Sequence, residues 1–326
     1  MRVVVAVQGW PGVGGRLSLS PADAAAAVLE AWREARPGTD VVAIPVADGS
    51  PRTADALTGP RSAVGGVEAV EGPGGLWLAP AEGAPRWNPH GLSTALLGLA
   101  AAGETRTVHI PLGDESPAGD AVDLWGGHAD AVRQALSSLP MVALVGSARP
   151  LLGFQGMSSA VRDGRESDPA IALAAQEQER RWSGIALEGD ALAGGASLMG
   201  PSRLSDVPGA GAAGGLAYCL AVLGARLAPG APYVLEALGI GAEAEGADVL
   251  AAVTGELTPR TLDAGVASAL AEQAARRALP ATALAPSVQV GKRDLMAAGL
   301  ASAHEAAPGI DGLRDGVRRL AHTWAR

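Results

Sequence analysis

The sequence predicts an α/β fold with two domains, and three observations indicate it. The chain has 326 residues, which is long for one small domain and suits two α/β domains. Strand, helix and strand patterns follow one another within residues 3–46, as in a βαβ unit with a right-handed crossover. Short aliphatic runs that suit buried parallel strands then alternate with helical segments as far as residue 285.

The first βαβ unit is the most clearly marked part of the chain. Val3–Val7 is a continuous apolar run typical of a strand that is buried on both faces. Ser20 is a good helix N-cap and Pro21 suits the first helical position, so a helix is expected from there to Glu34. Residues 37–38 end the helix, and Val41–Val46 is the second strand.

The later elements are predicted from the same patterns. Strands are expected over residues 76–79, 107–112, 141–145, 248–254 and 281–285. Helices are expected over residues 91–102, 129–136, 168–182, 211–227 and 262–279. Residues 59–75 are rich in Gly and Pro and are interpreted as a domain crossing, and residues 184–200 as a surface loop.

Composition limits the classes of function. The formal net charge is −9 and the chain has no basic cluster, so we expect no nucleic-acid partner. The single cysteine, Cys219, allows neither an internal disulfide nor a cysteine zinc site. We expect no signal peptide and no membrane span, and therefore a cytoplasmic protein. The oligomeric state is left open, with a homo-oligomer among the alternatives.

Four loops at predicted strand ends could carry chemistry, because α/β proteins bind ligands there. The first, residues 9–16, is either an anion site at a helix N-terminus or a flexible connection. It is not a Walker A loop, since Arg16 stands where a lysine is required, and it is not a dinucleotide fingerprint, since Leu17 replaces the third glycine.

Each of the other three loops also allows two interpretations, one functional and one structural. Asp48 follows the second strand and suits either metal or substrate binding or a plain Asp-Gly turn. The glycines of residues 208–216 allow a close approach of backbone to backbone or of backbone to a ligand. Glu256, after the strand that ends near Thr254, is either a functional carboxylate or a helix-capping acid.

These motifs together resemble the bacterial glycerate kinases that use ATP. The resemblance rests on Ala47-Asp48-Gly49, on the run Pro208 to Leu216, and on Thr254-Gly255-Glu256, in this order and spacing. Residues 19–22 and 150–153 are also similar to the family, and the likeness extends from residue 1 to about residue 290. Its most specific part is Pro-Gly-Ala-Gly-Ala-Ala-Gly-Gly at residues 208–215.

The resemblance implies a Rossmann-like discontinuous domain, residues 1–62 and 235–326, with a second α/β domain, residues 63–234, inserted into it. It implies an active site between the domains and phosphoryl transfer from ATP, with Mg²⁺, to a glycerate hydroxyl. The implied site residues fall into two groups. Those expected to be catalytic are Asp48, Asp120 and Glu256, with Asp114 an alternative to Asp120 as the base. Those expected to bind substrate or phosphate are Arg16, Ser18, Thr53 and Thr254, while the metal ligands are unknown.

The chain departs from the family at loops that carry charge. Gly15-Arg16-Leu17-Ser18 stands where the family has Phe-Lys-Gly-Ser, and Arg52 lies near the place of a Glu. The loop at residues 113–120 lacks the expected Gly-Ser-Ala-Thr-Asn-Asp-Gly-Gly, residues 162–164 replace Gln-Lys-Gly, and the Gly-Arg after Glu256 is lost. Phosphoryl transfer depends on positioned charges, so these changes point to weakened or altered chemistry.

Three functions follow from this comparison. The first is a glycerate kinase family protein with weak, lost or redirected activity, which uses ATP and Mg²⁺ if it is active and no cofactor otherwise. The second is a non-catalytic protein that binds a glycerate-like organic acid or a protein partner in the cleft. The third is an ordinary glycerate kinase whose active residues lie elsewhere around insertions.

Overall fold

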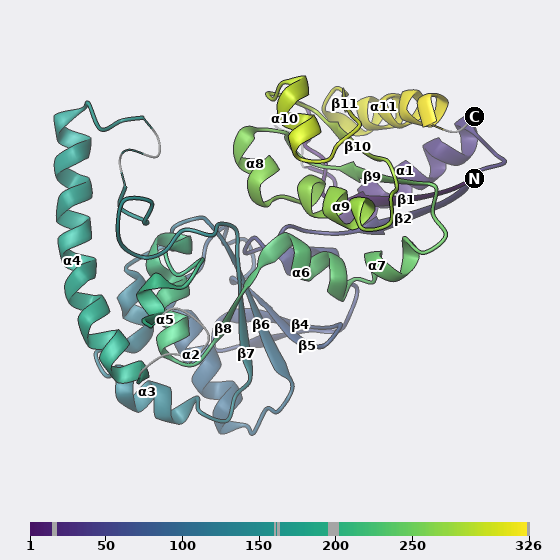
Figure 1. The fold of residues 1–326 in the computed structure, drawn as a ribbon. Helices are drawn as coiled ribbons and strands as arrows, with labels where there is room; N and C mark the ends of the chain where they lie inside the picture. Colours follow the sequence, from purple (N-terminus) through teal and green to yellow (C-terminus); the bar gives the residue numbers. More distant parts are fainter. Residues whose placement is uncertain (15–17, 160, 162–163, 195–201, 325–326) are drawn as a thin grey trace. The chain divides into compact units, whose positions relative to one another are not determined.

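The computed structural model describes residues 1–14, 18–159, 161, 164–194 and 202–324. It divides into two compact units, each a mixed α/β structure, as the sequence predicts (Figure 1). Unit 1 comprises residues 1–48, 55–58 and 231–326, and unit 2 comprises residues 49–54 and 59–230. The domain boundaries expected at residues 62 and 235 stay a prediction, since compactness alone does not define an independent domain.

Unit 1 contains a parallel sheet within its described residues. Its spatial order is β11 (Ser302–Glu305), β10 (Ala281–Ala285), β9 (Val249–Val253), β1 (Arg2–Val7) and β2 (Asp40–Pro45). Its helices are α1 (Pro21–Ala35), α7 (Ile240–Glu243), α8 (Pro259–Ala264), α9 (Val266–Ala275), α10 (Lys292–Ala297) and α11 (Gly309–Trp324). Helix α6 (Gly230–Ala237) begins at the last residue of unit 2 and lies otherwise in unit 1.

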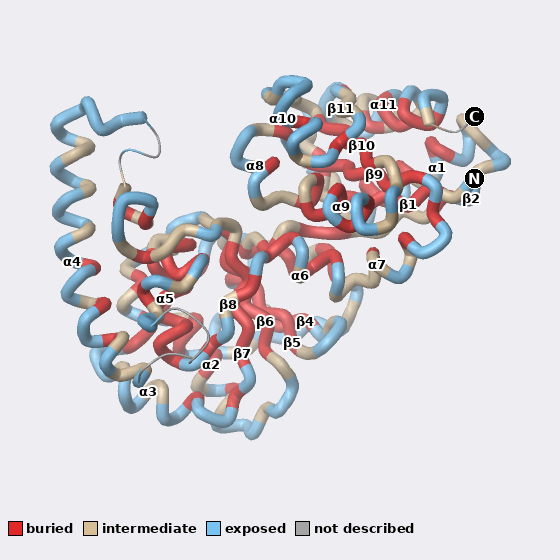
Figure 2. Tube along the Cα trace, viewed as in Figure 1, coloured by how far each residue is buried: buried red, intermediate tan, exposed pale blue. Residues whose placement is uncertain are grey.

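Alternate side chains of β1 enter two separate cores, which is why its whole sequence is apolar. Val3, Val5 and Val7 pack with α1 and α11, whereas Val4 and Ala6 pack in the cluster that contains α9. All five are fully buried (Figure 2). This is the arrangement expected of a central parallel strand that is covered by helices on both faces.

Unit 2 contains a mixed sheet in the order β3 (Arg61–Val64), β4 (Val67–Gly72), β5 (Gly75–Ala79), β6 (Thr107–Gly113), β7 (Met141–Val145) and β8 (Arg226–Pro229). β3, β4 and β5 pair antiparallel, and β5 to β8 pair parallel. Its α-helices are α2 (Pro89–Ala101), α3 (Ala129–Ala135), α4 (Pro169–Ala193) and α5 (Leu216–Val222). Its short 3₁₀ helices are η2 (Ala121–Trp125), η4 (Leu204–Asp206) and η5 (Ala212–Gly215).

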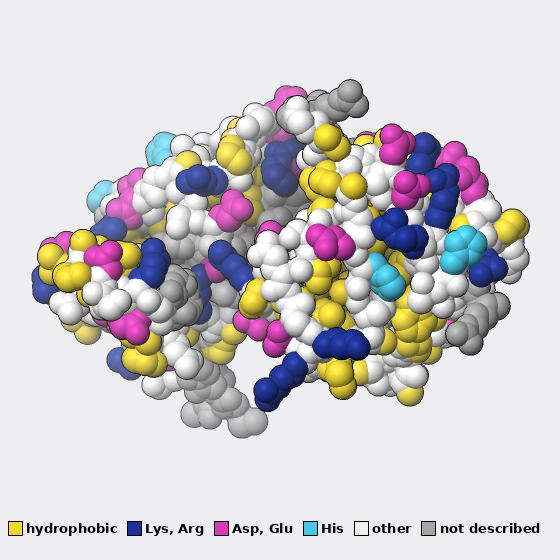
Figure 3. Space-filling view, turned by 90° about the horizontal axis from the view of Figure 1, so that it is seen from above, with side chains coloured by type: hydrophobic (Ala, Val, Ile, Leu, Met, Phe, Trp, Pro, Cys, Tyr) yellow, Lys and Arg dark blue, Asp and Glu magenta, His cyan; other side chains and the backbone are white. Residues whose placement is uncertain are grey.

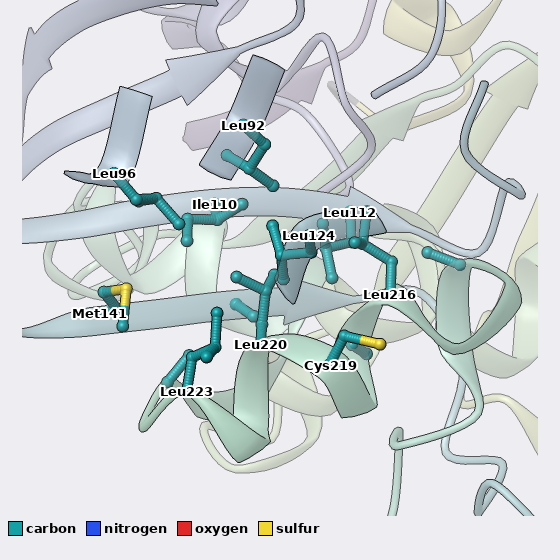
Figure 4. Close-up of a cluster of buried hydrophobic side chains, with 14 of the residues drawn as sticks. Leu92, Leu96, Ile110, Leu112, Leu124, Met141, Leu216, Cys219, Leu220 and Leu223 are labelled. Atoms are coloured by element: carbon teal, nitrogen blue, oxygen red, sulfur yellow. The ribbon is translucent and has the colours of Figure 1, made fainter. Parts of the chain in front are cut away.

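Side chains from α2, β6, η2, β7 and α5 form the main core of unit 2 (Figure 4). Leu92, Ile110, Leu124 and Leu220 are each fully buried there. Cys219 is buried in the same cluster, and burial raises the pKa of its thiol well above the usual value. Cys219 is therefore part of the packing of this core.

Several element predictions were wrong. Residues 59–75 contain the β3–β4 hairpin, whose turn residues Gly65 and Gly66 have positive φ, rather than only a crossing. Residues 184–193 continue α4, whereas residues 195–201 lie outside the described part of the chain. The helix expected over 211–227 covers only Leu216–Val222, and the one expected over 262–279 breaks at Gly265, whose backbone is extended.

None of the described helices is both long and apolar enough to cross a membrane.

Candidate functional site

The carboxyl edge of the unit 1 sheet holds Thr254, one of the residues expected to bind substrate. Its side chain is buried at the end of β9. The Thr254 hydroxyl donates a hydrogen bond to Gln8 Oε1 at 2.7 Å, and the Gln8 backbone N–H donates to the Val253 carbonyl at 2.9 Å. Thr254 therefore ties two neighbouring strand ends together, and a ligand that accepted a hydrogen bond from its hydroxyl would have to replace Gln8.

Glu256 lies two residues further along and its side chain is exposed. It is not the cap of the following helix, because α8 begins with a capping box formed by Thr258 and Thr261. The reading as a helix-capping acid is wrong for this reason. The functional reading of Glu256 stays a prediction, since nothing in unit 1 tests it.

The loop between β1 and α1 is closed by two backbone hydrogen bonds. Trp10 and Leu19 exchange backbone N–H···O=C bonds of 3.1 and 2.8 Å, and Trp10 is fully buried. Ser18, next to this closure, is exposed. Arg16, the residue expected to bind phosphates, lies outside the described residues.

The N-terminus of α1 already holds a carboxylate. The Ser20 side chain accepts from the Asp23 backbone N–H at 3.1 Å and donates to Asp23 Oδ2 at 2.6 Å. A negative charge in the first turn is favourable with the helix dipole and would repel a phosphate at the same place. An anion site in this region therefore depends on loop residues 11–18 rather than on the helix end.

Asp48 and Thr53 belong to the segment after β2. Asp48 is half-buried and takes part in interactions of its own. Thr53 is fully buried, and both its backbone N–H and its hydroxyl donate to the Ser50 carbonyl, at 2.9 and 2.7 Å. The structure thus uses the Thr53 hydroxyl to close a turn, which leaves it little freedom to meet a ligand.

The carboxyl edge of the unit 2 sheet brings together two loops that are distant in sequence. Asp114 follows β6, and Ser147 and Arg149 follow β7. Arg149 Nη2 forms an ion pair with Asp114 Oδ2, and the Ser147 hydroxyl donates to Asp114 Oδ1 at 3.2 Å. The two charged side chains are only 10% and 16% exposed, for Asp114 and Arg149 respectively. A nearly buried ion pair at such an edge is the strongest polar feature of the described candidate residues.

The glycine run packs against the backbone of the loop that carries Arg149. The backbone N–H groups of Gly209 and Gly211 both donate to the Arg149 carbonyl, at 3.1 and 2.9 Å. A Cβ on Gly211 would lie 2.3 Å from the Pro150 carbonyl oxygen, and one on Gly214 would lie 3.1 Å from Ser116 Oγ. These glycines therefore allow the run to approach both loops. We define the residues Asp114, Ser147 and Arg149, with the run 208–216, as the β6–β7 edge site.

Asp120, the base expected from the family resemblance, has structural partners. Its Oδ1 accepts from the Val122 backbone N–H at 3.2 Å and so caps η2, and its Oδ2 forms an ion pair with Arg181 of α4. Both side chains are partly exposed. Asp114 is accordingly the better candidate for chemistry at the edge of the sheet.

Sequence reasoning missed Arg149. The available signal was its position, four residues after a strand that was predicted with the correct bounds and one residue before the family-like segment 150–153. An arginine at a strand's carboxyl end can bind a carboxylate through two parallel hydrogen bonds. Among the described residues, no group of three or more His, Cys, Asp or Glu side chains could hold a metal ion. Mg²⁺ that arrives with nucleotide phosphates requires only one or two protein carboxylates.

Comparison with known proteins places these features in a family. Uncharacterized proteins of Mycobacterium bovis and Mycobacterium tuberculosis are each 28% identical to this chain over 316 residues, covering 88% of it and 80% of theirs. The crystal structure titled "putative glycerate kinase 2" from Salmonella typhimurium LT2 has the same fold, with a TM-score of 0.62 and 19% identity over 99% of this chain and 98% of the other. Residues 126–325 match the Glycerate kinase family, and with well over half of its length matched this chain belongs to that family.

Proposed function

We propose that this protein binds a small hydroxy acid of the glycerate type at the β6–β7 edge site and transfers phosphate to it from ATP slowly or not at all. Family membership supports the substrate class. The main support for the proposal is the ion pair of Asp114 with Arg149, because both charged side chains are nearly buried at the carboxyl edge of the unit 2 sheet.

The ion pair gives Arg149 and Asp114 opposing roles. Arg149 can receive the carboxylate of an organic acid through its planar guanidinium group. Asp114 would have to accept the proton of the acid's hydroxyl in order to act as a base. In the structure Asp114 Oδ2 is engaged by Arg149 and Oδ1 by Ser147. Arg149 can therefore bind a ligand carboxylate, and Asp114 can accept a proton, only if the ion pair between them breaks.

The free energy needed to break this ion pair favours slow phosphate transfer. Breaking a buried ion pair by removing one partner commonly costs about 3–5 kcal/mol. A cost of that size on the reaction barrier corresponds to a rate loss between roughly 10²-fold and 5 × 10³-fold. Binding of a carboxylate to Arg149 replaces one anion with another, so binding is affected less than transfer.

ATP and Mg²⁺ would supply the phosphoryl group and the charge neutralisation for any transfer that remains. Asp48 and Glu256 stay our candidates for holding the metal or the substrate, and Arg16 and Ser18 for the phosphates. A cytoplasmic location and the absence of nucleic-acid and membrane partners remain predictions from the sequence.

A coupled assay with glycerate, ATP and Mg²⁺ tests the proposal on the purified chain. We expect turnover well below about 1 per second, the slow end of ordinary kinases. Faster turnover would show an ordinary glycerate kinase and overturn the proposal. Calorimetry with ATP and Mg²⁺ then separates the remaining alternatives, because a protein that binds glycerate but no nucleotide is a non-catalytic acid-binding protein.

Substitution of Asp114 tests whether the acid binds at this site. Asp114→Asn keeps the shape of the side chain and removes its charge, so Arg149 gains freedom to bind a ligand carboxylate. We expect glycerate to bind several-fold more tightly, by calorimetry, and residual turnover to fall further. Arg181→Gln, which breaks a different arginine–aspartate pair of unit 2, is the matched control and should leave glycerate affinity unchanged. Equal glycerate affinity in the Asp114 variant and the unmodified chain would place the acid elsewhere.

A further inference from the structure

Helix α4 carries two opposite faces, and unit 2 uses only one of them. Its C-terminal half is packed through Trp182, Ala186 and Gly189, which are buried. Trp182 meets Tyr218 edge-on at a ring distance of 6.5 Å, and the Tyr218 hydroxyl donates to the Ala186 carbonyl at 3.2 Å. These contacts hold the C-terminal half of α4 against the rest of unit 2.

The opposite face is an exposed stripe with alternating spacings of four and three residues. Its six members, all exposed, are Leu173, Glu177, Arg180, Gly184, Leu187 and Ala191. Such spacing keeps side chains on one side of a helix and is the spacing of helix–helix seams. We call these six residues the α4 stripe.

The α4 stripe exposes more apolar surface than a solvent face requires. The exposed fractions are 56% for Leu173 and 76% for Leu187, two of the few large apolar side chains exposed in the described residues. Both lie on the helix that extends from the rest of unit 2 in Figure 1, where Figure 2 shows mostly exposed residues. The left end of Figure 3 corresponds to the position of α4 in Figure 1, and apolar side chains lie there among charged ones.

The charges at the middle of the stripe are complementary to a second copy of it. Glu177 and Arg180 make no hydrogen bond or ion pair within the described part of the chain. If two α4 stripes pair antiparallel about a two-fold axis between these residues, each Glu177 faces the Arg180 of the other copy. An isologous contact makes every such pair twice.

The same register places the apolar residues against small ones. Leu173, four residues before Glu177, then faces Gly184, four residues after Arg180, in the other copy. Leu187 faces Ala170, which is also exposed. A large side chain opposite a small one is the way in which helix surfaces interlock. Parallel pairing would instead place each glutamate against a glutamate and each arginine against an arginine.

We infer that the α4 stripe is the contact surface of a homodimer in which two α4 helices pair antiparallel, with Glu177 of each copy against Arg180 of the other. A single helix pair buries less than the roughly 1,200 Å² of a standard interface. The dimer is therefore weak, with a dissociation constant between about 1 μM and 1 mM, and depends on protein concentration. The inference is independent of the proposed catalytic activity.

Sedimentation equilibrium of the full chain over that concentration range tests the dimer. Glu177→Arg puts like charges opposite each other twice and should raise the dissociation constant at least about tenfold. Arg180→Glu should do the same. The double variant Glu177→Arg/Arg180→Glu exchanges the two charges and should restore the dimer, as should a mixture of the two single variants. Glu82→Arg, an equal charge change at an exposed site outside α4, is the control and should have no effect.

Two outcomes would overturn the inference. One is a chain that stays monomeric up to about 1 mM. The other is a double variant that stays as weak as the single variants, because only the antiparallel register is restored by exchanging both charges. All the substitutions lie on exposed positions, and unchanged melting temperatures would show that folding is not the cause.

Disulfide trapping fixes the register directly. A chain with Leu173→Cys and Gly184→Cys should form a covalent dimer on oxidation, since the two positions face each other across the proposed contact. Within one helix they lie about 16 Å apart, too far for a disulfide in the same chain. Leu173→Cys alone should not cross-link, and efficient cross-linking by that single variant would indicate a parallel pair and contradict the proposal.

Discussion

At the scale of single residues, His109 shows how burial sets the charge of a side chain. It lies on β6, is 1% exposed and stacks on Trp77 with ring centres 4.3 Å apart. Burial, with a smaller effect from the charge of Arg226, lowers the pKa of His109 to about 4 from an ordinary value of 6.5. The folded protein therefore keeps this imidazole neutral at a pH at which the unfolded chain would protonate it.

This pKa shift predicts a pH dependence of stability. A folded pKa below the unfolded one means that the unfolded state binds the extra proton, so stability is lost as pH falls from about 6.5 towards 4. The loss from His109 should approach about 1.4 kcal/mol per pH unit within that window. His109→Phe keeps a ring against Trp77 and removes the titration. Urea unfolding at several pH values measures the free energy of unfolding of both proteins. As the pH falls from about 6.5 to 4, the value for the variant should rise relative to that of the unmodified chain by this slope. Parallel profiles would contradict the assignment.

At the scale of elements, the glycine run that precedes α5 allows neighbouring elements to pack closely. Gly215 has a φ of 89°, and a Cβ there would lie 2.4 Å from the Trp182 ring. Gly209, with the same φ, approaches Val145 closely, since a Cβ would lie 2.7 Å from it. The left-handed residues Ala213 and Gly214 prevent the helix from beginning earlier. The run therefore brings α4, α5 and the end of β7 together.

Substitution of Gly215 should consequently destabilise the protein with or without ligand. Gly215→Val combines a strained backbone with overpacking against Trp182, which together cost about 2–5 kcal/mol. Gly224→Ala is the control, since its φ is 104° but a Cβ there meets nothing within 4 Å, and it should show only the smaller cost of backbone strain. Thermal melts measured with and without glycerate distinguish a packing role of Gly215 from a role in ligand binding. A Gly215 variant that keeps its melting temperature and loses only ligand binding would show a functional role instead.

At the scale of the whole molecule, the chain forms two units, each with its own sheet and core. The segment 49–54 belongs to unit 2, and the Gly49 carbonyl accepts from the Gly113 backbone N–H at 2.8 Å. A fragment of residues 49–230 therefore contains every part of unit 2, together with the short segment 55–58. Its apolar clusters do not depend on residues of unit 1.

We expect the fragment 49–230 to fold by itself. Circular dichroism should show a single cooperative thermal transition, because a chain of this size can bury a sufficient core. A fragment from residue 59 to 230, which lacks the segment 49–54, should be less stable, since it loses the hydrogen bond to Gly113 and the buried Thr53. A fragment 49–230 without cooperative unfolding would show that unit 2 depends on unit 1.

The central strands and the class of fold could be predicted from the sequence, because local pattern is sufficient for them. β1 and β7 were predicted to within one residue, since a strand covered on both faces must be apolar throughout. The antiparallel hairpin β3–β4 was missed because its strands are short, mix polar with apolar residues, and include the mostly exposed strand β3. The C-terminal half of α4 was missed because Gly184 and Gly189 weaken the helical pattern, whereas packing on Tyr218 holds the helix.

The site divides in the same way. By itself, the sequence determined the glycine run, the order of the loops and the family to which they belong, since these depend on residue type and spacing along the chain. Only the tertiary structure decided which side chains meet. Asp114 and Arg149 are 35 residues apart, and they form an ion pair because β6 and β7 are neighbouring strands that pair in parallel. Thr53 closes a buried turn through its hydroxyl, and its expected role in substrate binding stays a prediction. Long-range contacts of this kind are set by the pairing of strands, and no local pattern of residues encodes them.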